Sequence, residues 1–183
     1  MRHAFEYMQK PEGSAVWLRL SNFAMPQPAR ELNADHVIAG AHWITPPQTG
    51  AALAIAYQGP VAAEAEKAFA LVRDEVPGVG LLAITSPNRL YAGWRAAQQS
   101  RRKGVIAQAH IEDILAPLAP NAALVTVLDG HPAAHSWLGG VRGQRVMALG
   151  PDHFGQSGTV AELYREYGLD CDAILDACAE ALG

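Results

Sequence analysis

Short apolar runs alternate along most of the chain with stretches in which apolar residues recur at helical spacing. Short runs that are almost wholly apolar are typical of strands buried on both faces of a sheet. Such runs lie at residues 51–59, 79–86, 123–130 and 144–149. Strands of this kind that alternate with helices predict an α/β fold with a mostly parallel sheet, covered by helices on both faces.

Two of the intervening helices are predicted from both spacing and end signals. Residues 60–75 begin with a proline and continue with apolar side chains at helical spacing, namely Val61, Ala65, Ala68, Phe69 and Val72. Ser86 followed by Pro87 is typical of an N-cap and a first helical residue. A helix is therefore predicted from Pro87 to about residue 102.

Three more helices are predicted in the second half of the chain. One covers about residues 107–115. Thr159 and Glu162 have the spacing of a capping box, in which each residue satisfies a backbone N–H of the other, so a helix begins there. The last helix begins at Asp170 or Asp172.

The N-terminal part of the chain has a different pattern. A short strand is predicted at residues 15–20, and an extended linker follows it because Pro26 and Pro28 remove backbone donors and favour extended neighbours. Residues 36–44 could add a further strand to the sheet, in an antiparallel direction.

Composition and charge exclude several classes of protein. The chain has 183 residues, of which 50% are hydrophobic and 17% charged, with a formal net charge of −4, so it is expected to be one globular domain. The basic cluster at residues 101–103 is predicted to complement a helix C-terminus, so no nucleic-acid partner is expected. No apolar segment has the length of a signal peptide or a membrane span, so a cytoplasmic protein without a membrane partner is expected. Cys171 and Cys178 are predicted to be buried thiols.

Three predicted turns follow strands, where α/β proteins bind ligands near helix N-termini. They are residues 85–88, 129–132 and 150–155. Asp129 is a possible N-cap for a helix that Pro132 opens, which is a purely structural role. The sequence lacks the glycine pattern of dinucleotide-binding folds, the phosphate-binding loop of nucleotide hydrolases and the G-x-S-x-G elbow of serine hydrolases.

Residues in and near the same turns could form two further kinds of site, a hydrolase triad or a metal site, each with weak support. A hydrolase triad would combine Ser157, His153 and Asp129, although no spacing requires it. A metal site would combine His131, His135 and His153, since the first two lie four residues apart on one face of a helix. The glutamate of the H-E-x-x-H motif is absent, so this second pattern is also weak.

The tail of the chain resembles the C-terminal domain of the transketolase family of thiamine-diphosphate enzymes. The motif is Asp-His-Phe-Gly-Gln-Ser-Gly at residues 152–158, followed by a helix, a Tyr-Gly-Leu-Asp turn and a final helix. The segments "GVGLLAITSPNRLYAGW" and "WLRLSNFAMPQP" are most similar to the homodimeric decarboxylase component of the pyruvate dehydrogenase complex and to transketolase-like proteins. The resemblance extends over about residues 15–183.

The resemblance implies a three-layer α/β/α sandwich with a five-stranded mixed sheet, one strand of which is antiparallel. It also implies that residues 1–35 are the end of a preceding domain and a linker, and that residues 36–183 form the transketolase C-terminal-like domain. In the family this domain shapes the dimer and lies near the substrate channel, while thiamine diphosphate and Mg²⁺ are held by other domains.

The chain departs from the whole enzyme at the diphosphate motif. The family has Gly-Asp-Gly followed by an asparagine, whereas here Leu128 precedes Asp129 and Gly130, and no asparagine follows Asn121. We therefore assign no catalytic, cofactor-binding or metal-binding residue to this chain and expect thiamine diphosphate and Mg²⁺ only in the parent enzyme. The expected partners are the cofactor-binding domains or subunits of a thiamine enzyme, together with further copies of the chain in a homo-oligomer.

Seven residues of the three turns are candidates for interface or anion contacts: Ser86, Asp129, His131, Asp152, His153, Phe154 and Ser157.

Three functions follow as hypotheses. The chain is the C-terminal domain of a thiamine-dependent transketolase or 2-oxoacid decarboxylase, inactive alone. Alternatively, it is a free-standing module that binds an anion or small ligand at the helix N-termini near Ser86, His131 and Thr159. A third possibility is an assembly domain whose interface contains Trp94, Trp137 or the linker at residues 23–28.

Overall fold

The structure is a computed structural model, and it describes residues 1–22, 24–26 and 28–183. These residues contain a five-stranded sheet in the order β1-β3-β2-β4-β5. The strands are β1 (Ala41–Thr45), β2 (Ala51–Gln58), β3 (Gly80–Ile84), β4 (Leu118–Leu128) and β5 (Arg145–Leu149). β2, β3, β4 and β5 run parallel, and β1 pairs antiparallel with β3. The predicted mixed, mostly parallel sheet is confirmed.

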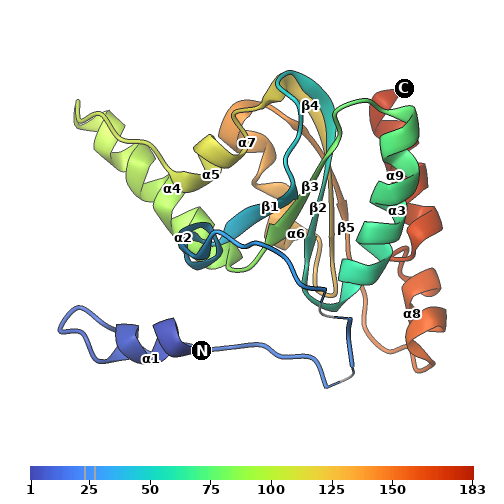
Figure 1. Cartoon of the computed structure of the whole chain (residues 1–183), viewed down its shortest axis with the longest axis horizontal. Helices are drawn as coiled ribbons and strands as arrows, with labels where there is room; N and C mark the ends of the chain where they lie inside the picture. The colour runs from blue at the N-terminus through green and yellow to red at the C-terminus, as the bar shows by residue number, and fades with distance from the viewer. Residues whose placement is uncertain (23, 27) are drawn as a thin grey trace.

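Helices cover both faces of this sheet (Figure 1). The helices of the described residues are, in chain order, α1 (Arg2–Met8), α2 (Ala34–Ala39), the 3₁₀ turn η1 (Gly59–Val61), α3 (Ala62–Glu75), α4 (Pro87–Arg102), α5 (His110–Ile114), α6 (Ala133–Ser136), α7 (Gly139–Arg142), α8 (Val160–Glu166) and α9 (Cys171–Leu182). α3, α8 and α9 lie on one side of the sheet, and α4, α5, α6 and α7 lie on the other (Figure 1). The three-layer α/β/α sandwich is therefore confirmed.

Each face of the sheet has its own buried apolar cluster, because successive side chains of a strand point to opposite faces. Ile55 and Val125 face the layer of α3 and α9, where they pack with Ile174. Leu124 faces the opposite layer and packs in the cluster that contains Leu138. The central strands are thus buried on both sides, which explains why they are short and almost wholly apolar.

The helix predicted at residues 60–75 is confirmed. Pro60 lies in η1, which leads directly into α3. All five apolar side chains of the predicted face are buried: Val61, Ala65, Ala68, Phe69 and Val72. A buried stripe of this width fixes the helix against the sheet by burial of apolar surface.

Two predictions for the N-terminal third need correction. Residues 15–20 are extended but form no strand with any described part of the chain. Residues 36–39 belong to α2, because the Asn33 side chain accepts hydrogen bonds from the backbone N–H groups of Asp35 and His36 and so caps a helix. The strand begins only at Ala41, after Gly40 ends α2, and its antiparallel direction is confirmed.

The helix ends follow the predicted signals in two of three cases. Thr159 Oγ1 accepts from the backbone N–H of Glu162, whose carboxylate accepts from the N–H of Thr159, so the capping box is confirmed. Asp170, rather than Asp172, is the N-cap of α9. Ser86 precedes α4 as predicted, but its hydroxyl donates to Oδ1 of Asn88 and does not cap the helix.

The two cysteines have different environments. Cys178 is buried, and burial raises the pKa of its thiol to about 11. Cys171 is only partly buried, because it is the first residue of α9 and lies at the edge of the apolar cluster, so the prediction of a buried thiol is wrong there. Neither sulfur forms a disulfide in the described structure. None of the helices in the described ranges has both the length and the apolar character needed to cross a lipid bilayer.

Candidate functional site

The carboxyl ends of the four parallel strands meet at one edge of the sheet. The chain leaves β2 toward β3 on one side and leaves β4 toward β5 on the other, so the strand order reverses between β2 and β4. In open α/β sheets, ligands bind in the crevice at such a switch point, outside the carboxyl ends of the strands. Here the residues at that place are Gln58, which ends β2, and Asp129, which follows β4.

Asp129 binds an arginine from the N-terminal segment. Arg19 Nη1 donates to Oδ1 at 3.0 Å and Nη2 donates to Oδ2 at 2.8 Å, which is a two-pronged ion pair across 110 residues of sequence. Nη2 also lies 3.3 Å from the backbone oxygen of Asp129. The carboxylate is therefore engaged by Arg19 and is no helix cap, so that sequence interpretation was wrong. α6 starts after Pro132, with the Ala133 N–H donating to His131 Nδ1.

A cavity of about 500 Å³ lies at this switch point. Its walls come from the N-terminal segment, the end of β2 and the end of β4, and they comprise Arg19, Leu20, Ser21, Asn22, Met25, Gln58, Gly59, Pro60 and Asp129. Gly59 has a φ of 78°, and a Cβ there would lie 3.0 Å from Asp129 Oδ1, so a glycine allows the two turns to approach. Among the described residues, the walls of the cavity thus carry one cation, one anion and two side-chain amides.

A buried polar pair lies behind the cavity. His135 on α6 is fully buried, and its Nε2 donates to Oε1 of Gln58 at 2.8 Å. Burial lowers the pKa of His135 to about 4, so the ring is neutral at physiological pH. Its Nδ1 and the hydroxyl of Thr126 have no hydrogen-bond partner among the described residues. Gln58 therefore links the buried histidine to the wall of the cavity.

The turn after β5 packs directly against the turn after β4. A Cβ on Gly150 would lie 2.3 Å from the backbone oxygen of Gly130, so the two turns touch through their backbones. Beyond Gly150, His153 Nδ1 is 2.7 Å from Asp152 Oδ1, and this hydrogen bond lowers the pKa of Asp152. The ring of His153 also lies 5.1 Å from the ring of Tyr167.

The predicted candidates fall into three groups. Asp129, His131 and the Asp152–His153 pair lie around the touching turns after β4 and β5. Ser86 lies at the end of β3, beside a second groove. Phe154 and Ser157 are exposed, and Phe154 is fully so.

Among the described residues, neither the hydrolase triad nor the histidine metal site is formed. Asp129 is bound to Arg19 and His153 to Asp152, and no hydrogen bond joins Ser157 to His153, so the triad does not form among the described residues. His135 is buried against Gln58, away from solvent, because α6 turns it into the core. Within the described ranges, no group of three or more His, Cys, Asp or Glu side chains is arranged to hold a metal ion.

An aromatic group covers the start of α4 and the end of α6. The rings of Trp94 and Trp137 are stacked at 5.4 Å, and Tyr91 meets Trp137 edge-on at 5.2 Å. Both tryptophans are partly buried against the core, while Tyr91 is exposed. Trp94 and Trp137 thus pack against the core, and their role in an interface stays a prediction. The linker at residues 23–28, also named as an interface, contains Phe23 and Gln27, which lie outside the described residues.

Comparison with known proteins gives structural matches only. No protein-family model matches the sequence, and no curated protein is similar to it in sequence. A chain of a split-gene transketolase, described as an inactive β4 tetramer, matches with a TM-score of 0.54 at 16% identity, over 93% of this chain and 48% of that chain. The transketolases from Leishmania mexicana and Campylobacter jejuni match with TM-scores of 0.53 and 0.56, at 16% and 11% identity. They cover 80% and 78% of this chain, and the match covers 18% of each of them.

The chain has the fold of a transketolase C-terminal domain. At these identities the likeness concerns the fold alone. The chain spans about half the length of the split-gene transketolase chain and 18% of the other two transketolase chains. The resemblance of the tail motif to transketolase C-terminal domains therefore agrees with the three-dimensional structure.

Two residues at the switch point of this transketolase C-terminal fold were not foreseen from the sequence. Arg19 could not be placed, because nothing local connects it to a turn 110 residues away. Gln58 had a usable signal, since it is the polar residue that ends an otherwise apolar strand at the ligand-binding edge.

The Asp129→Asn variant is expected to release the N-terminal segment from the transketolase C-terminal fold. Amide substitution removes the ion pair to Arg19, which is partly exposed and therefore contributes at most about 1 kcal/mol. Chymotryptic cleavage near Trp17 and Leu20, measured in dilute protein, should become roughly two- to five-fold faster. The cleavage sites are the same in both proteins, so the change in rate reports how firmly the segment is held.

Asp152→Asn provides the matched control for this cleavage experiment. Asp152 is an exposed carboxylate on the neighbouring turn, and its side chain bonds His153 rather than the N-terminal segment. Its substitution should leave the cleavage rate near that of the unaltered protein. Equal acceleration by both variants would show that Arg19 does not hold the segment.

Proposed function

We propose that the chain is the C-terminal domain component of a thiamine-diphosphate-dependent enzyme of the transketolase type, inactive by itself. The observation that carries the proposal is the match of 93% of the chain to about half of a split-gene transketolase chain. A split enzyme needs a separate chain for the remaining domains, and this chain has the fold such a piece requires. The tail motif at residues 152–158 supports the same assignment.

Within this proposal, residues 1–35 are the end of a preceding domain and its linker, and residues 36–183 are the C-terminal domain. Residues 17–28 and 78–94 are similar to the pyruvate dehydrogenase decarboxylase component and to transketolase-like proteins, so the proposed parent enzyme is either a transketolase or a 2-oxoacid decarboxylase. We also propose that the protein is cytoplasmic and forms a homo-oligomer.

The role of the chain in such an enzyme is to support the reaction site from outside. Thiamine diphosphate, when bound by the partner domains, supplies the electron sink for cleavage next to a carbonyl. We propose that the edge formed by the turns after β4 and β5 borders the substrate channel. There Asp129 fixes the N-terminal segment through Arg19, and Asp152 holds His153 in place. Both are positioning roles, and the chain contributes no residue to cofactor chemistry.

Two measurements test this proposal. Calorimetric titration of the purified chain with thiamine diphosphate and Mg²⁺ should give no saturable heat of binding. Saturable binding at micromolar concentration would contradict the proposal that the partner domains alone bind the cofactor. Purification of the chain from its own cells, with mass identification of bound proteins, should recover a chain that carries the Gly-Asp-Gly…Asn motif. Recovery of the chain with only further copies of itself would overturn the split-enzyme assignment.

The anion-binding alternative is favoured at one of its three turns. α4 has 16 residues, and no side chain caps its N-terminus, because the Ser86 hydroxyl bonds Asn88 instead. At the other two helix starts, a side chain already accepts a hydrogen bond from a backbone N–H that an anion would need. Thr159 caps α8, and His131 Nδ1 accepts from the N–H of Ala133. Inorganic phosphate should raise the melting temperature if this alternative is correct, because a ligand of the native state stabilises it by mass action. An unchanged melting temperature would exclude it.

A further inference from the structure

The positive charge of the chain is concentrated in and around α4. Residues 76–111 contain five arginine and lysine residues and no aspartate or glutamate, although acidic residues outnumber basic ones in the whole chain, 18 against 14. The residues after 160 have the opposite balance, with six acidic side chains and one basic side chain. They belong mostly to α8 and α9, which lie on the other side of the sheet from α4 (Figure 1). The protein therefore has a basic side and an acidic side.

Most cations of the basic side are not neutralised by an acidic neighbour. Arg101 is neutralised, since its guanidinium donates two hydrogen bonds to the carboxylate of Glu112. Arg95 donates only to an uncharged side-chain amide. Arg102 and Lys103 are exposed, and their side chains form no ion pair or hydrogen bond with any residue that the structure describes. The end of α4 thus presents positive charge that only solvent or a partner can balance.

Two exposed aliphatic side chains follow these cations directly. Val105 is 57% exposed and Ile106 is fully exposed. The backbone N–H of Gly104 donates to the oxygen of Arg101 and that of Val105 donates to the oxygen of Ser100, which is the Schellman motif that ends many helices. An apolar contact between the residue at the position of Val105 and the last helical turn often accompanies this motif. Ser100 offers no such contact, so Val105 stays in solvent.

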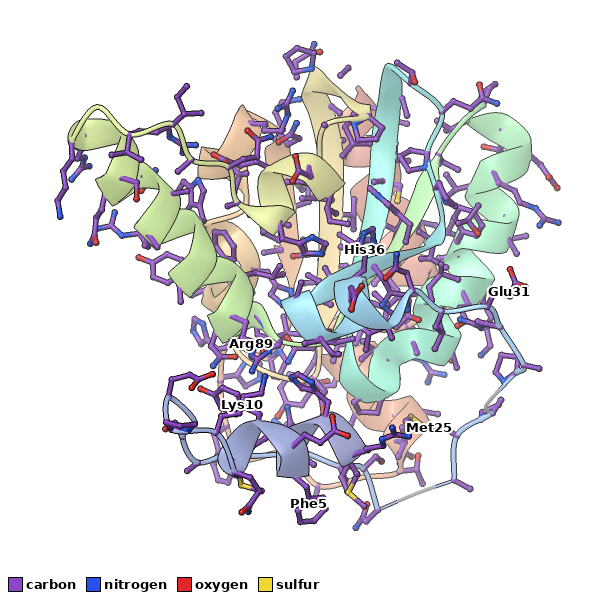
Figure 2. The ribbon with its side chains drawn as sticks, turned by 60° about the vertical axis from the view of Figure 1, so that its left-hand side comes forward. Phe5, Lys10, Met25, Glu31, His36 and Arg89 are labelled. Atoms are coloured by element: carbon purple, nitrogen blue, oxygen red, sulfur yellow. The ribbon has the colours of Figure 1, made fainter. Side chains whose placement is uncertain are left out.

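The turn is fixed in this position by hydrogen bonds. Arg101 Nη1 donates to the backbone oxygen of Ala107 at 2.9 Å and also to Glu112 on α5, so one guanidinium ties the returning chain to the next helix. Figure 1 shows the end of α4 projecting away from the sheet, at the left-hand edge of the molecule. In Figure 2, Arg89 marks the beginning of the same helix, which lies near α1.

The projecting turn is remote from the candidate site. A helix of 16 residues is about 24 Å long, and α4 begins at the carboxyl edge of the sheet, directly after β3. The turn at its far end is therefore separated from the touching turns after β4 and β5.

We propose that Arg102, Lys103, Val105 and Ile106, which we call the α4 tip, bind the surface of a membrane that contains anionic lipids. The two cations contact the lipid phosphates, while the two aliphatic side chains enter the boundary between headgroups and acyl chains. This inference does not depend on the proposed function, because the α4 tip lies outside the candidate site. The sequence-based expectation of no membrane partner was drawn from the lack of a spanning segment, which a surface contact does not require.

Three features of the α4 tip favour a lipid surface over an acidic protein. The tip projects, so a protein partner would need a matching pocket, whereas a bilayer surface accommodates small apolar side chains. The cations and the aliphatic side chains are adjacent, as the headgroup and acyl layers of a membrane are. The acidic side formed by α8 and α9 lies across the sheet, so an extended anionic surface attracts the molecule in one orientation only.

Binding through the α4 tip is expected to be weak and reversible, because two cations and two aliphatic side chains make a small contact. Each cation near an anionic lipid surface increases the affinity about fivefold. The contribution of the charges decreases as salt screens them.

The first test is sedimentation of the unaltered protein with vesicles of phosphatidylglycerol and phosphatidylcholine in equal amounts. We expect saturable binding at millimolar lipid, weaker binding at high salt and none to vesicles of phosphatidylcholine alone. The double variant Arg102→Gln/Lys103→Gln should bind about 25-fold more weakly, because two charges are lost. Ile106→Ser should bind about fivefold more weakly, because an apolar side chain is lost. Absence of binding to the anionic vesicles would overturn the proposal.

Two variants on α3 are the matched controls. Arg73→Gln and Leu71→Ser remove a cation that is 61% exposed and an aliphatic side chain that is 56% exposed, on the other side of the sheet. Both control proteins should bind the vesicles as the unaltered protein does. Equal weakening by the control and the tip variants would indicate non-specific adsorption and overturn the proposal. The melting temperatures should all be unchanged, because the substituted side chains are exposed.

The second test measures insertion of the α4 tip. Ile106→Cys in a Cys171→Ser background is labelled with an environment-sensitive fluorophore, and Cys178 is buried and stays unlabelled. The emission should shift to the blue on the anionic vesicles, whereas a label on Leu71→Cys in the same background should not shift. An unshifted label at position 106 on vesicle-bound protein would overturn the proposed insertion.

Poly-glutamate distinguishes an acidic protein from a lipid surface. If the unaltered protein does not bind the anionic vesicles but binds poly-glutamate, and Arg102→Gln/Lys103→Gln abolishes that binding, the α4 tip recognises an acidic protein. The lipid proposal would then be wrong.

Discussion

The Gly150→Ala variant is expected to lose about 3 kcal/mol of unfolding free energy, because overpacking of a rigid contact forces the backbone to move. The added Cβ would lie 2.3 Å from the backbone oxygen of Gly130 and 3.1 Å from Cδ of Pro132. Neither neighbour is the end of a flexible side chain, so the turn after β5 must move away from the turn after β4.

Gly93→Ala is the matched control for this variant. Gly93 lies in α4, and a Cβ there meets nothing within 4 Å. Alanine should therefore stabilise the helix by up to about 1 kcal/mol. Urea unfolding followed by circular dichroism measures both variants, and a Gly150→Ala protein as stable as the unaltered chain would contradict the contact between the two turns.

The Gly150 contact matters for the candidate site because it joins its two halves. Asp129 and His131 belong to the turn after β4, whereas Asp152 and His153 belong to the turn after β5. Moving one turn relative to the other would separate these side chains without altering any of them. Under the proposed function, the variant should also weaken association with the cofactor-binding partner.

Acidification is expected to destabilise the protein through His135. The pKa of this ring is about 4 in the folded protein against 6.5 as a reference, so the unfolded chain binds the proton more readily between these pH values. The contribution of the neutral ring is complete above about pH 6.5 and is lost progressively as the pH falls toward 4, by at most about 3 kcal/mol. The physical cause is burial, since the protonated Nδ1 would have no acceptor.

The measurement is urea unfolding at several pH values between 7 and 4, for the unaltered protein and for His135→Gln. Burial also lowers the pKa of His42, so the unaltered protein has a second histidine that contributes to the slope. The difference between the two proteins isolates His135. The stability of His135→Gln should fall less steeply in the range from pH 6.5 to 5, and parallel curves would contradict the assignment.

The sequence by itself determined the elements whose signals are local. The apolar run of β2, the buried stripe of α3 and the capping box of Thr159 and Glu162 each depend on residues within a few positions of one another. Helical spacing, strand hydrophobicity and caps are short-range interactions, so they can be predicted before the fold is known. The alternation of these elements was enough to predict a parallel sheet with helices on both faces.

Only the tertiary structure decided which distant side chains meet. Arg19 binds Asp129, and Gln58 binds His135, through contacts that join different layers and edges of the sheet. The strand predicted at residues 15–20 illustrates the same limit, because its sequence favours extended structure but pairing requires a partner strand at the right place. The register of strands and the stacking of turns are set by the packing of the whole chain, and no local pattern encodes them.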